Sequence, residues 1–219
     1  MVRAATNARA AAVSSKSPKR GKKVARIGVL ALQGDFAEHM KALEDAGAEA
    51  VEVRKVEQLE GLDGLIIPGG ESTTISKLME RFGFREAVPA AMKKGMAVWG
   101  TCAGMIVMAR ELTDPYPTPM NLMNIKVSRN WFGRQVDSFE ADFKVKGLRG
   151  GPFRAIFIRA PVIDEVGKGV EFLAALPDGH AVAVRSGRNL GTSFHPELTG
   201  DSRFHEMFAR LALERGDED

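Results

Sequence analysis

Short apolar runs alternate with helix-like segments through the first half of the chain, and this alternation restricts the fold more than any other feature. Strand-like runs occur at 27–32, 50–53, 65–67 and 96–99, and amphipathic helical patterns occur at 36–46, 74–81, 85–94 and 103–112. Repeated strand–helix units predict a mostly parallel sheet that is covered by helices. We therefore expect an α/β fold.

The second half of the chain has a different pattern. Strand-like stretches at 137–145, 153–159, 170–176 and 181–185 are joined by short polar or glycine-containing turns. This pattern predicts extra antiparallel or mixed strands. A last apolar strand at 190–194 leads into a closing helix over 202–214, with Asp201 as its expected N-cap. The length of 219 residues fits one domain, which we expect over 25–219, after a tail over 1–24.

The basic charge of the chain is concentrated in this tail. Of the 31 Lys and Arg residues, eight precede the first acidic residue, Asp35, which leaves 23 basic against 28 acidic residues in the remainder. The body has no basic excess, so we expect no nucleic-acid partner. The tail lacks apolar periodicity, which predicts disorder. Its alternatives are an organelle transit peptide, or a contact of Lys19-Arg20-Gly21-Lys22-Lys23 with nucleic acid or an anionic surface.

Composition excludes several other classes. The single cysteine cannot form an intrachain disulfide, and it makes a cysteine-based zinc or iron–sulfur site implausible. We expect no metal and a reducing, cytoplasmic setting. No apolar run approaches the roughly 18 residues that a membrane-spanning helix needs, so we expect no membrane association.

The most specific local pattern surrounds that cysteine. Gly100-Thr101-Cys102-Ala103-Gly104 joins an apolar strand to a helix, as in a nucleophile elbow. Small flanking residues allow the tight bend, and the start of a helix favours the thiolate, which is the attacking form. The alternative is a buried structural cysteine, but the glycines on both sides favour a catalytic nucleophile.

A thiolate that attacks an amide also needs a proton donor for the leaving amine, and histidine suits that role near neutral pH. Among four histidines, His195 ends an apolar strand, and Glu197 follows it closely enough to orient the imidazole. We expect the other three, His39, His180 and His205, to be solvated or structural. The predicted catalytic residues are Cys102, His195 and Glu197.

A second strand ends in the glycine turn Pro68-Gly69-Gly70-Glu71-Ser72. Glycine allows bare backbone to approach a ligand, so the N–H groups of Gly70 and Ala103 are the expected oxyanion hole. The rival interpretation is a phosphate-binding loop. It is disfavoured because no lysine follows the glycines in Walker fashion and no G-x-G-x-x-G is present.

Taken together, these motifs resemble those of the class I glutamine amidotransferases. More narrowly, Leu30-Ala31-Leu32-Gln33-Gly34, the run from Arg129 to Glu140, and Phe157-Ile158-Arg159-Ala160-Pro161 resemble the glutaminase subunits of pyridoxal 5′-phosphate synthase. The resemblance covers about residues 26–210. It implies a single flavodoxin-like domain that hydrolyses L-glutamine to L-glutamate and ammonia.

The resemblance also implies substrate contacts and a partner. By motif position, the glutamine contacts fall on these residues: Gly70, Glu71, Ser72, Arg129, Ile158 and Arg159. The planar fork of an arginine suits a carboxylate, although a surface or interdomain ion pair is the alternative for Arg129 and Arg159. Ammonia would pass to a separate synthase subunit with a (β/α)8 barrel fold. Pyridoxal phosphate is then the product of that partner, and no cofactor is expected in this chain.

Two other functions remain open at this stage. A free-standing cysteine hydrolase or peptidase could use the same elbow, because this chemistry serves many acyl compounds. A binding module that has lost catalysis would lack a member of the triad, and all three are present. We also expect the isolated chain to be a poor glutaminase that becomes active on binding the synthase subunit.

Overall fold

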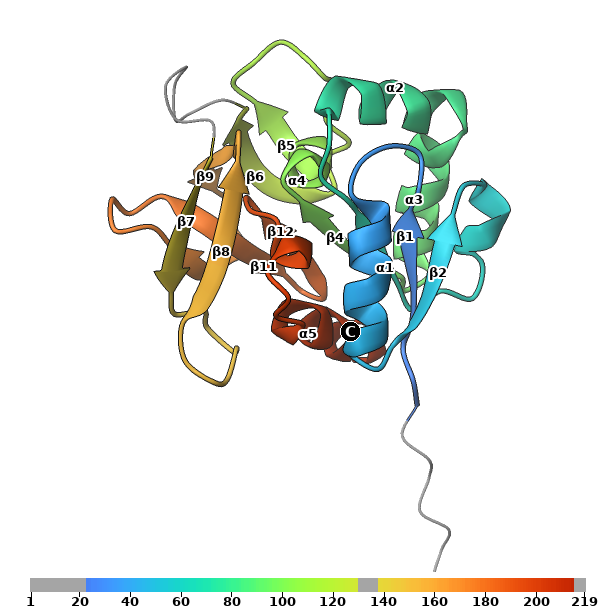
Figure 1. Ribbon diagram of the computed structural model, residues 1–219. Helices are drawn as coiled ribbons and strands as arrows, with labels where there is room; N and C mark the ends of the chain where they lie inside the picture. Colours follow the sequence, from blue (N-terminus) through green and yellow to red (C-terminus); the bar gives the residue numbers. More distant parts are fainter. Residues whose placement is uncertain (1–22, 130–137, 215–219) are drawn as a thin grey trace, which may run out of the picture.

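The computed structural model describes residues 23–129 and 138–214 (Figure 1). Helices occupy α1 (Phe36–Asp45), α2 (Ser72–Arg81), α3 (Phe84–Lys93), α4 (Ala103–Met108) and α5 (Arg203–Leu213), with 3-10 turns η1 (Val56–Leu59) and η2 (Pro196–Leu198). The strands are β1 (Arg26–Leu30), β2 (Glu49–Val53), β3 (Gly64–Ile67), β4 (Ala97–Thr101), β5 (Ala109–Leu112), β6 (Met123–Ser128), β7 (Ser138–Phe143), β8 (Phe153–Ile158), β9 (Val162–Val166), β10 (Glu171–Ala175), β11 (Ala181–Ser186) and β12 (Asn189–Thr192).

A large sheet forms the centre of the described structure. Its order is β2-β1-β3-β4-β12-β11-β9-β6-β5, and β10 pairs with β11. The strands from β2 to β12 in this order are mutually parallel, whereas β11 runs antiparallel to β12 and β9 antiparallel to β6. Central strands β3 and β4 are buried along their whole length, as expected for a parallel sheet covered on both faces.

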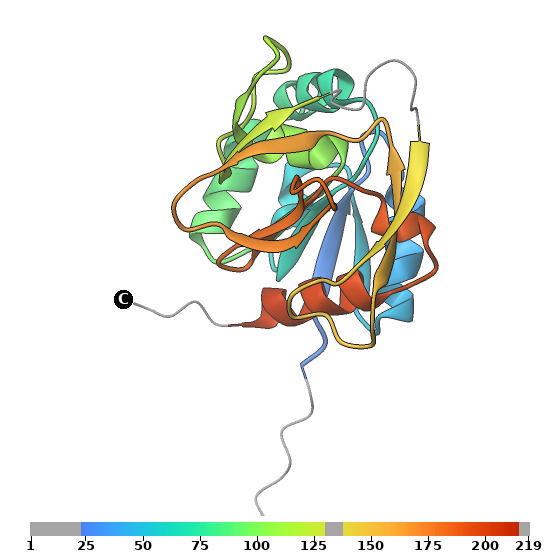
Figure 2. The same ribbon diagram turned by 90° about the vertical axis from the view of Figure 1, so that its left-hand side faces the viewer.

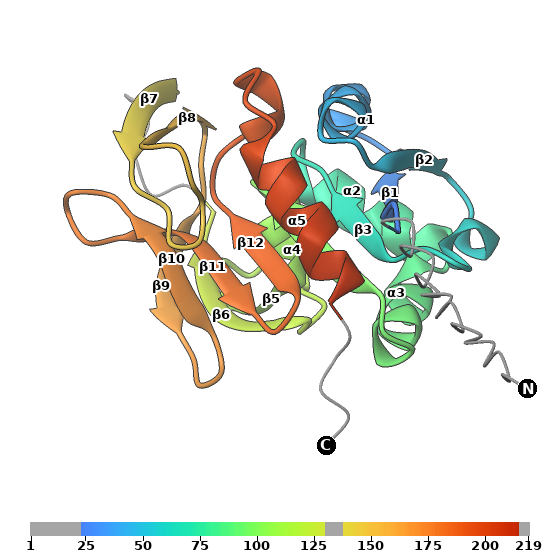
Figure 3. The ribbon, with the colours of Figure 1, turned by 90° about the horizontal axis from the view of Figure 1, so that it is seen from below.

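Helices cover the two faces of this sheet and create two hydrophobic cores (Figure 3). Alternate residues of one strand belong to different cores: Ala97 and Trp99 pack with α1 and α5, while Val98 packs with α2, α3 and α4. This is the period-two alternation of a strand buried on both sides. Most of the apolar surface of the strands is thus removed from water.

A separate two-stranded sheet, β7 and β8, lies beside the α5 face (Figure 2). Phe139 and Phe157 stack across it, with ring centroids 4.5 Å apart. Phe157 and Phe194 form an edge contact at 5.5 Å that joins this sheet to the segment after β12. Aromatic contacts therefore hold β8 against the segment that contains His195.

The α/β prediction is confirmed, including the mostly parallel sheet and the added antiparallel strands. The helix predicted over 103–112 was too long, because α4 ends at Met108 and the chain continues as β5. Backbone hydrogen bonds from Asn121 and Leu122 to Ala109 and Met108 pull this segment into the sheet. Strands β5, β6 and β9 were not predicted.

The prediction of Asp201 as an N-cap was wrong in position. The N-cap of α5 is Ser202, and its side chain makes no capping hydrogen bond. Asp201 lies one residue earlier and accepts a hydrogen bond from the backbone N–H of Arg203 at 3.1 Å. The carboxylate therefore satisfies an N–H group of the first turn from outside the cap position.

The tail prediction over 1–24 falls largely outside the described residues, as does the motif segment 130–137. Within the described ranges, no helix has the length and apolar character needed to cross a membrane.

Candidate active site

Cys102 lies in a strained turn between β4 and α4. Its backbone has φ 47° and ψ −107°, a conformation that non-glycine residues rarely adopt. A Cβ on Gly104 would lie 1.9 Å from the carbonyl oxygen of Ile67, so only glycine fits there. The elbow predicted from sequence is present, and it places Cys102 at the N-cap position of α4, beside the end of β3.

His195 and Glu197 lie after β12, which is the neighbour of β4 in the sheet. The backbone N–H of His195 donates to Ile156 on β8 at 2.9 Å. Its Nδ1 is 2.7 Å from Oε1 of Glu197, and the Cys102 side chain lies near enough to the ring to raise the pKa of His195. The structure thus brings the three predicted catalytic residues together. Glu197 occupies Nδ1 of His195, which leaves Nε2 available for the Cys102 sulfur.

Local electrostatics favour a charged imidazole. Burial alone would lower the pKa of His195, but hydrogen bonds to Asp35, Cys102 and Glu197 outweigh it and raise the pKa to about 12. Burial raises the pKa of Glu197, and the hydrogen bond with His195 opposes that rise. The raised pKa of His195 favours the imidazolium, which donates from Nδ1 to Oε1 of Glu197.

Asp35 is a second carboxylate at His195, and sequence reasoning did not select it. Its Oδ2 lies 3.4 Å from Nδ1 of His195, and this contact lowers the pKa of Asp35. Asp35 follows β1, so it reaches the same carboxyl edge of the parallel sheet as Cys102. That position after a buried strand was the available signal.

The glycine loop after β3 lies directly against His195. A Cβ on Gly69 would come within 2.4 Å of Cε1 of the His195 ring. The carbonyl of Gly69 accepts from the N–H of Asp35 at 3.4 Å, and the N–H of Glu71 donates to Oε1 of Gln33 at 2.9 Å. Gly70, between these two anchors, has φ 143°. The segment that follows β1 therefore holds the predicted oxyanion loop.

Two of the predicted glutamine contacts meet each other. Glu71 caps α2 by accepting from the N–H groups of Thr73 and Thr74. Burial would raise the pKa of Glu71, but these bonds and that from the Thr74 hydroxyl together outweigh it and lower the pKa to about 2. Arg129, just after β6, places Nη2 3.5 Å from Oε1 of Glu71 and donates to the carbonyl of Tyr116 at 2.8 Å. The ion pair weighed as an alternative for Arg129 is thus present, with Glu71 as its partner.

The remaining predicted contacts lie beside the sulfur or the glycine loop. The carbonyl oxygen of Ile158, at the end of β8, is 3.8 Å from Sγ of Cys102. Arg159 follows it with φ 45°, a second non-glycine residue with positive φ near the site. Ser72 is buried at the start of α2, and Ala103 is buried as the first residue of α4.

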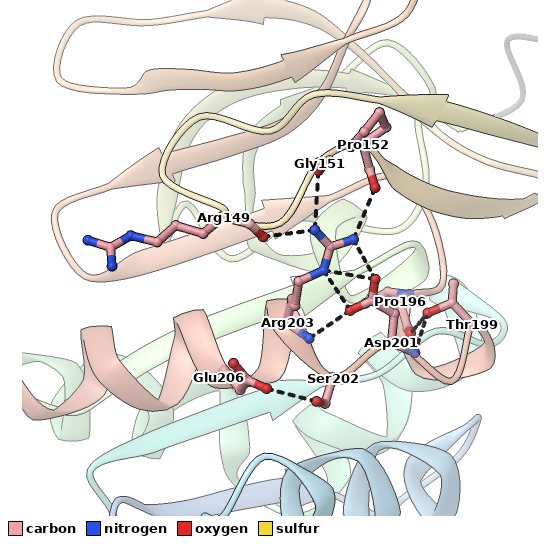
Figure 4. Close-up of polar contacts among 9 residues, drawn as sticks. All are labelled: Arg149, Gly151, Pro152, Pro196, Thr199, Asp201, Ser202, Arg203 and Glu206. Carbon is pink, nitrogen blue, oxygen red and sulfur yellow. Dashed lines mark hydrogen bonds and ion pairs between the residues drawn. The ribbon is translucent and has the colours of Figure 1, made fainter.

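A hydrogen-bond network around Arg203 supports the segment that carries Glu197 (Figure 4). The guanidinium donates to three carbonyls of the 149–152 turn at 2.9, 3.2 and 3.0 Å, and pairs with Asp201 at 2.6 Å. Asp201 in turn donates its N–H to Thr199, whose hydroxyl donates to the carbonyl of Pro196. Arg203 therefore ties the β7–β8 turn to the end of η2.

The ligand atoms of Asp35, His195 and Glu197 lie within 4.8 Å of one another, which is close enough for a metal ion. Their hydrogen bonds and ion contacts with each other already account for this spacing. The cluster gives no independent sign of a metal site. That the chain uses no metal stays a prediction.

The histidines outside the triad differ from expectation. His39 and His205 are fully buried, so the solvated alternative was wrong for both and the structural one holds. His180 lies on the β10–β11 turn, where it contacts Asp178. Nothing in the sequence pattern placed His39 next to the triad, because α1 and η2 are far apart along the chain.

Comparisons with known proteins identify the family of the chain. The family model described as the SNO glutamine amidotransferase family matches residues 29–214. A protein of Dehalococcoides mccartyi (strain BAV1) named pyridoxal 5′-phosphate synthase subunit PdxT is 60% identical over 189 residues, covering 85% of this chain and 97% of its own. A protein of Rhodococcus opacus (strain B4) with the same name is 52% identical over 193 residues, covering 84% and 96%.

Solved structures give the same result. A crystal structure described as a glutamine amidotransferase superposes with a TM-score of 0.80 and 53% identity, covering 85% of this chain and 98% of the other. A chain from the structure of PurLQS of Thermotoga maritima, with a TM-score of 0.60 and 18% identity over 87% of this chain and 98% of its own, shares the fold. The chain belongs to the SNO glutamine amidotransferase family.

Proposed function

We propose that this chain is the glutaminase subunit of a pyridoxal 5′-phosphate synthase, hydrolysing L-glutamine to L-glutamate and ammonia. The observation that carries the proposal is Cys102 on a strained elbow, beside the hydrogen-bonded pair His195 and Glu197. Family membership and the names of the relatives support the substrate and the pathway. The cysteine and the histidine provide the nucleophile and the proton donor that amide hydrolysis requires.

In the first half-reaction, Sγ of Cys102 attacks the side-chain amide carbon of glutamine. Nδ1 of His195 is occupied by Glu197, so Nε2 is the nitrogen left to give a proton to the departing nitrogen. The C–N bond breaks, ammonia leaves, and a γ-glutamyl thioester remains. The N–H groups of Gly70 and Ala103 stabilise the oxyanion of the tetrahedral intermediate.

In the second half-reaction, His195 takes a proton from water, and the resulting hydroxide attacks the thioester carbon. The C–S bond breaks, glutamate forms with the oxygen of water, and the sulfur returns as the thiolate. Glu197 keeps the imidazole oriented and stabilises its cation in both steps. It transfers no proton to substrate.

For substrate binding, we assign the α-carboxylate of glutamine to Arg129, whose guanidinium is one-quarter exposed beside Glu71. Gly70 and Ser72 line the same loop, while Ile158 and Arg159 lie on the side of β8 next to the sulfur. The Glu71 carboxylate offers an acceptor for the α-ammonium group.

Ammonia then passes to a synthase subunit, which we take to be a (β/α)8 barrel, in the cytoplasm. Pyridoxal phosphate is the product of that partner, and this chain carries no cofactor. The free-standing hydrolase remains the competing function, because the elbow chemistry alone does not select glutamine.

The test is glutamate release by the purified chain, alone and with a matching synthase subunit. We expect a low rate alone and a marked increase on mixing, with no increase when Cys102→Ala is used. Hydrolysis of simple thioesters or peptides at a rate above that for glutamine, with no response to the synthase, would instead favour the free-standing hydrolase.

A further inference from the structure

Behind the triad lies a buried polar cluster that the proposed mechanism does not use. His39 of α1 and His205 of α5 are both 0% exposed. Nδ1 of His39 is 2.9 Å from Nε2 of His205, and Nε2 of His39 is 3.1 Å from Oγ1 of Thr101 and 3.3 Å from Oε2 of Glu197. Close polar contacts therefore run from Glu197 through His39 to His205 on α5.

Glu197 presents its two carboxylate oxygens to two different histidines. Oε1 contacts His195 at 2.7 Å, and Oε2 faces His39. Oε2 is buried and has no hydrogen-bond partner among the described residues, and Nε2 of His39 lies 3.3 Å from it. Burying a carboxylate oxygen without a donor costs free energy. The nearby nitrogen of His39 can offset that cost at Oε2.

The contacts favour one set of tautomers. Nε2 of His39 hydrogen-bonds Oγ1 of Thr101 and lies beside a carboxylate oxygen, which only accepts, so we assign the proton to Nε2. Nδ1 of His39 then accepts from Nε2–H of His205. Nδ1 of His205 is then unprotonated, and it is buried without a hydrogen-bond partner among the described residues. Burial lowers the pKa of His39 well below its usual value and that of His205 to about 3, so both rings are neutral.

We propose that His39 is a positioning residue of the glutaminase, whose Nε2–H, set by the hydrogen bond from His205, fixes the Glu197 carboxylate and through it the imidazole of His195. His39 touches neither the reacting atoms nor the substrate in this role. The inference rests on the proposed triad, since it acts through Glu197.

The surroundings leave this ring little freedom. Trp99 makes an edge contact with His39 at 5.8 Å and with His205 at 5.0 Å. The titratable groups that face His39 are Glu197 and His195 from the segment around η2, and His205 from α5. Glu197 is hydrogen-bonded at Oε1 and packed against Nε2 of His39 at Oε2, which limits its rotation about the terminal side-chain bond.

Paired substitutions test the role, measured as kcat and KM for glutamine with the synthase subunit present. His39→Leu removes the donor, and we expect kcat to fall by roughly tenfold to a hundredfold with KM within about twofold. His39→Gln keeps an N–H at the position of Nε2 and should recover kcat to within about threefold. His180→Leu, on the distant β10–β11 turn, is the matched control and should change neither constant.

The decisive comparison is the double variant. If His39 acts through Glu197, His39→Leu combined with Glu197→Gln will be no slower than Glu197→Gln alone. A multiplied loss, or a failure of His39→Gln to recover kcat while folding normally, would overturn the proposal. If His39→Leu melts below the assay temperature, His39→Gln and His205→Phe replace it as the test. We then expect a kcat near the unsubstituted value for His39→Gln and a reduced kcat for His205→Phe.

The same samples separate this inference from the triad assignment. A diazoketone analogue of glutamine should label Cys102 in the unsubstituted chain. Without that label the triad itself is wrong. With the label, a multiplied loss in the double variant overturns the role of His39 alone.

Discussion

The catalytic residues and the glutamine-contact residues sit in contrasting environments. Cys102, His195 and Glu197 are each no more than 8% exposed and are held by backbone hydrogen bonds and close packing. Glu71 and Arg129 keep side-chain exposures of 53% and 25% and are joined by a long ion pair at 3.5 Å. The chemistry is therefore built on rigid elements, whereas recognition depends on groups that remain available to a ligand.

The largest expected effect comes from substituting the buried catalytic residues. His195→Ala should lower kcat by roughly 10⁴-fold or more, because it removes the proton carrier, whereas Glu197→Gln should cost less, roughly a hundredfold, because it orients without transferring a proton. Steady-state kinetics with the synthase subunit measures the ranking. Equal losses in two well-folded variants would mean that Glu197 does more than orient His195.

Substitution of an exposed glutamine-contact residue should change the KM for glutamine. Arg129→Ala removes the proposed partner of the α-carboxylate, so KM for glutamine should rise by roughly tenfold to a hundredfold with little change in kcat. Arg154→Ala is the matched control, because Arg154 is an exposed arginine of β8 that pairs with Glu140. A fall in kcat at constant KM would show that Arg129 does not bind the ground-state substrate.

Asp35 lies between the two environments, and its expected effect is a shift in pH dependence. Asp35 helps to raise the pKa of His195, so Asp35→Asn should lower that pKa, and the imidazolium will lose its proton at lower pH. The alkaline limb of kcat/KM should therefore move to lower pH by about one unit. Asp45→Asn, at the exposed end of α1, serves as control, and a shift to higher pH would contradict the assignment.

The smallest effect is expected from the tail. Deleting residues 2–22 keeps Lys23, which pairs with Asp63 at 2.6 Å, and should leave glutaminase activity and the melting temperature nearly unchanged. Activity assays and thermal melts with and without the synthase subunit would measure this. A loss of complex formation would give the tail a role in assembly.

The parts of the molecule that could be predicted from sequence are those with local signals. Buried strands ending in glycine turns identified β3, β4 and the elbow, because such turns require small residues at set positions. The end of α4 was missed, since Ala109 to Leu112 continues an apolar pattern that tertiary hydrogen bonds convert into an edge strand. Helical pattern alone cannot show that conversion.

The site shows the same limit. Cys102, His195 and Glu197 carry motif spacing, but Asp35 and His39 reach the triad through tertiary packing of α1 against η2. His39 lies on an ordinary amphipathic helix, and only its neighbours across the fold give it a partner. Asp35 had only the weak signal of its position after β1, and His39 had none.

Mass spectrometry of the chain after reaction with the diazoketone analogue of glutamine shows directly whether Cys102 is the nucleophile of a glutaminase. The chain has one cysteine, so every thiol adduct maps to Cys102. We expect one adduct per chain on Cys102, formed in step with loss of glutamate release and prevented by excess glutamine. An adduct on another residue, or full labelling of Cys102 with glutamate release intact, would contradict it.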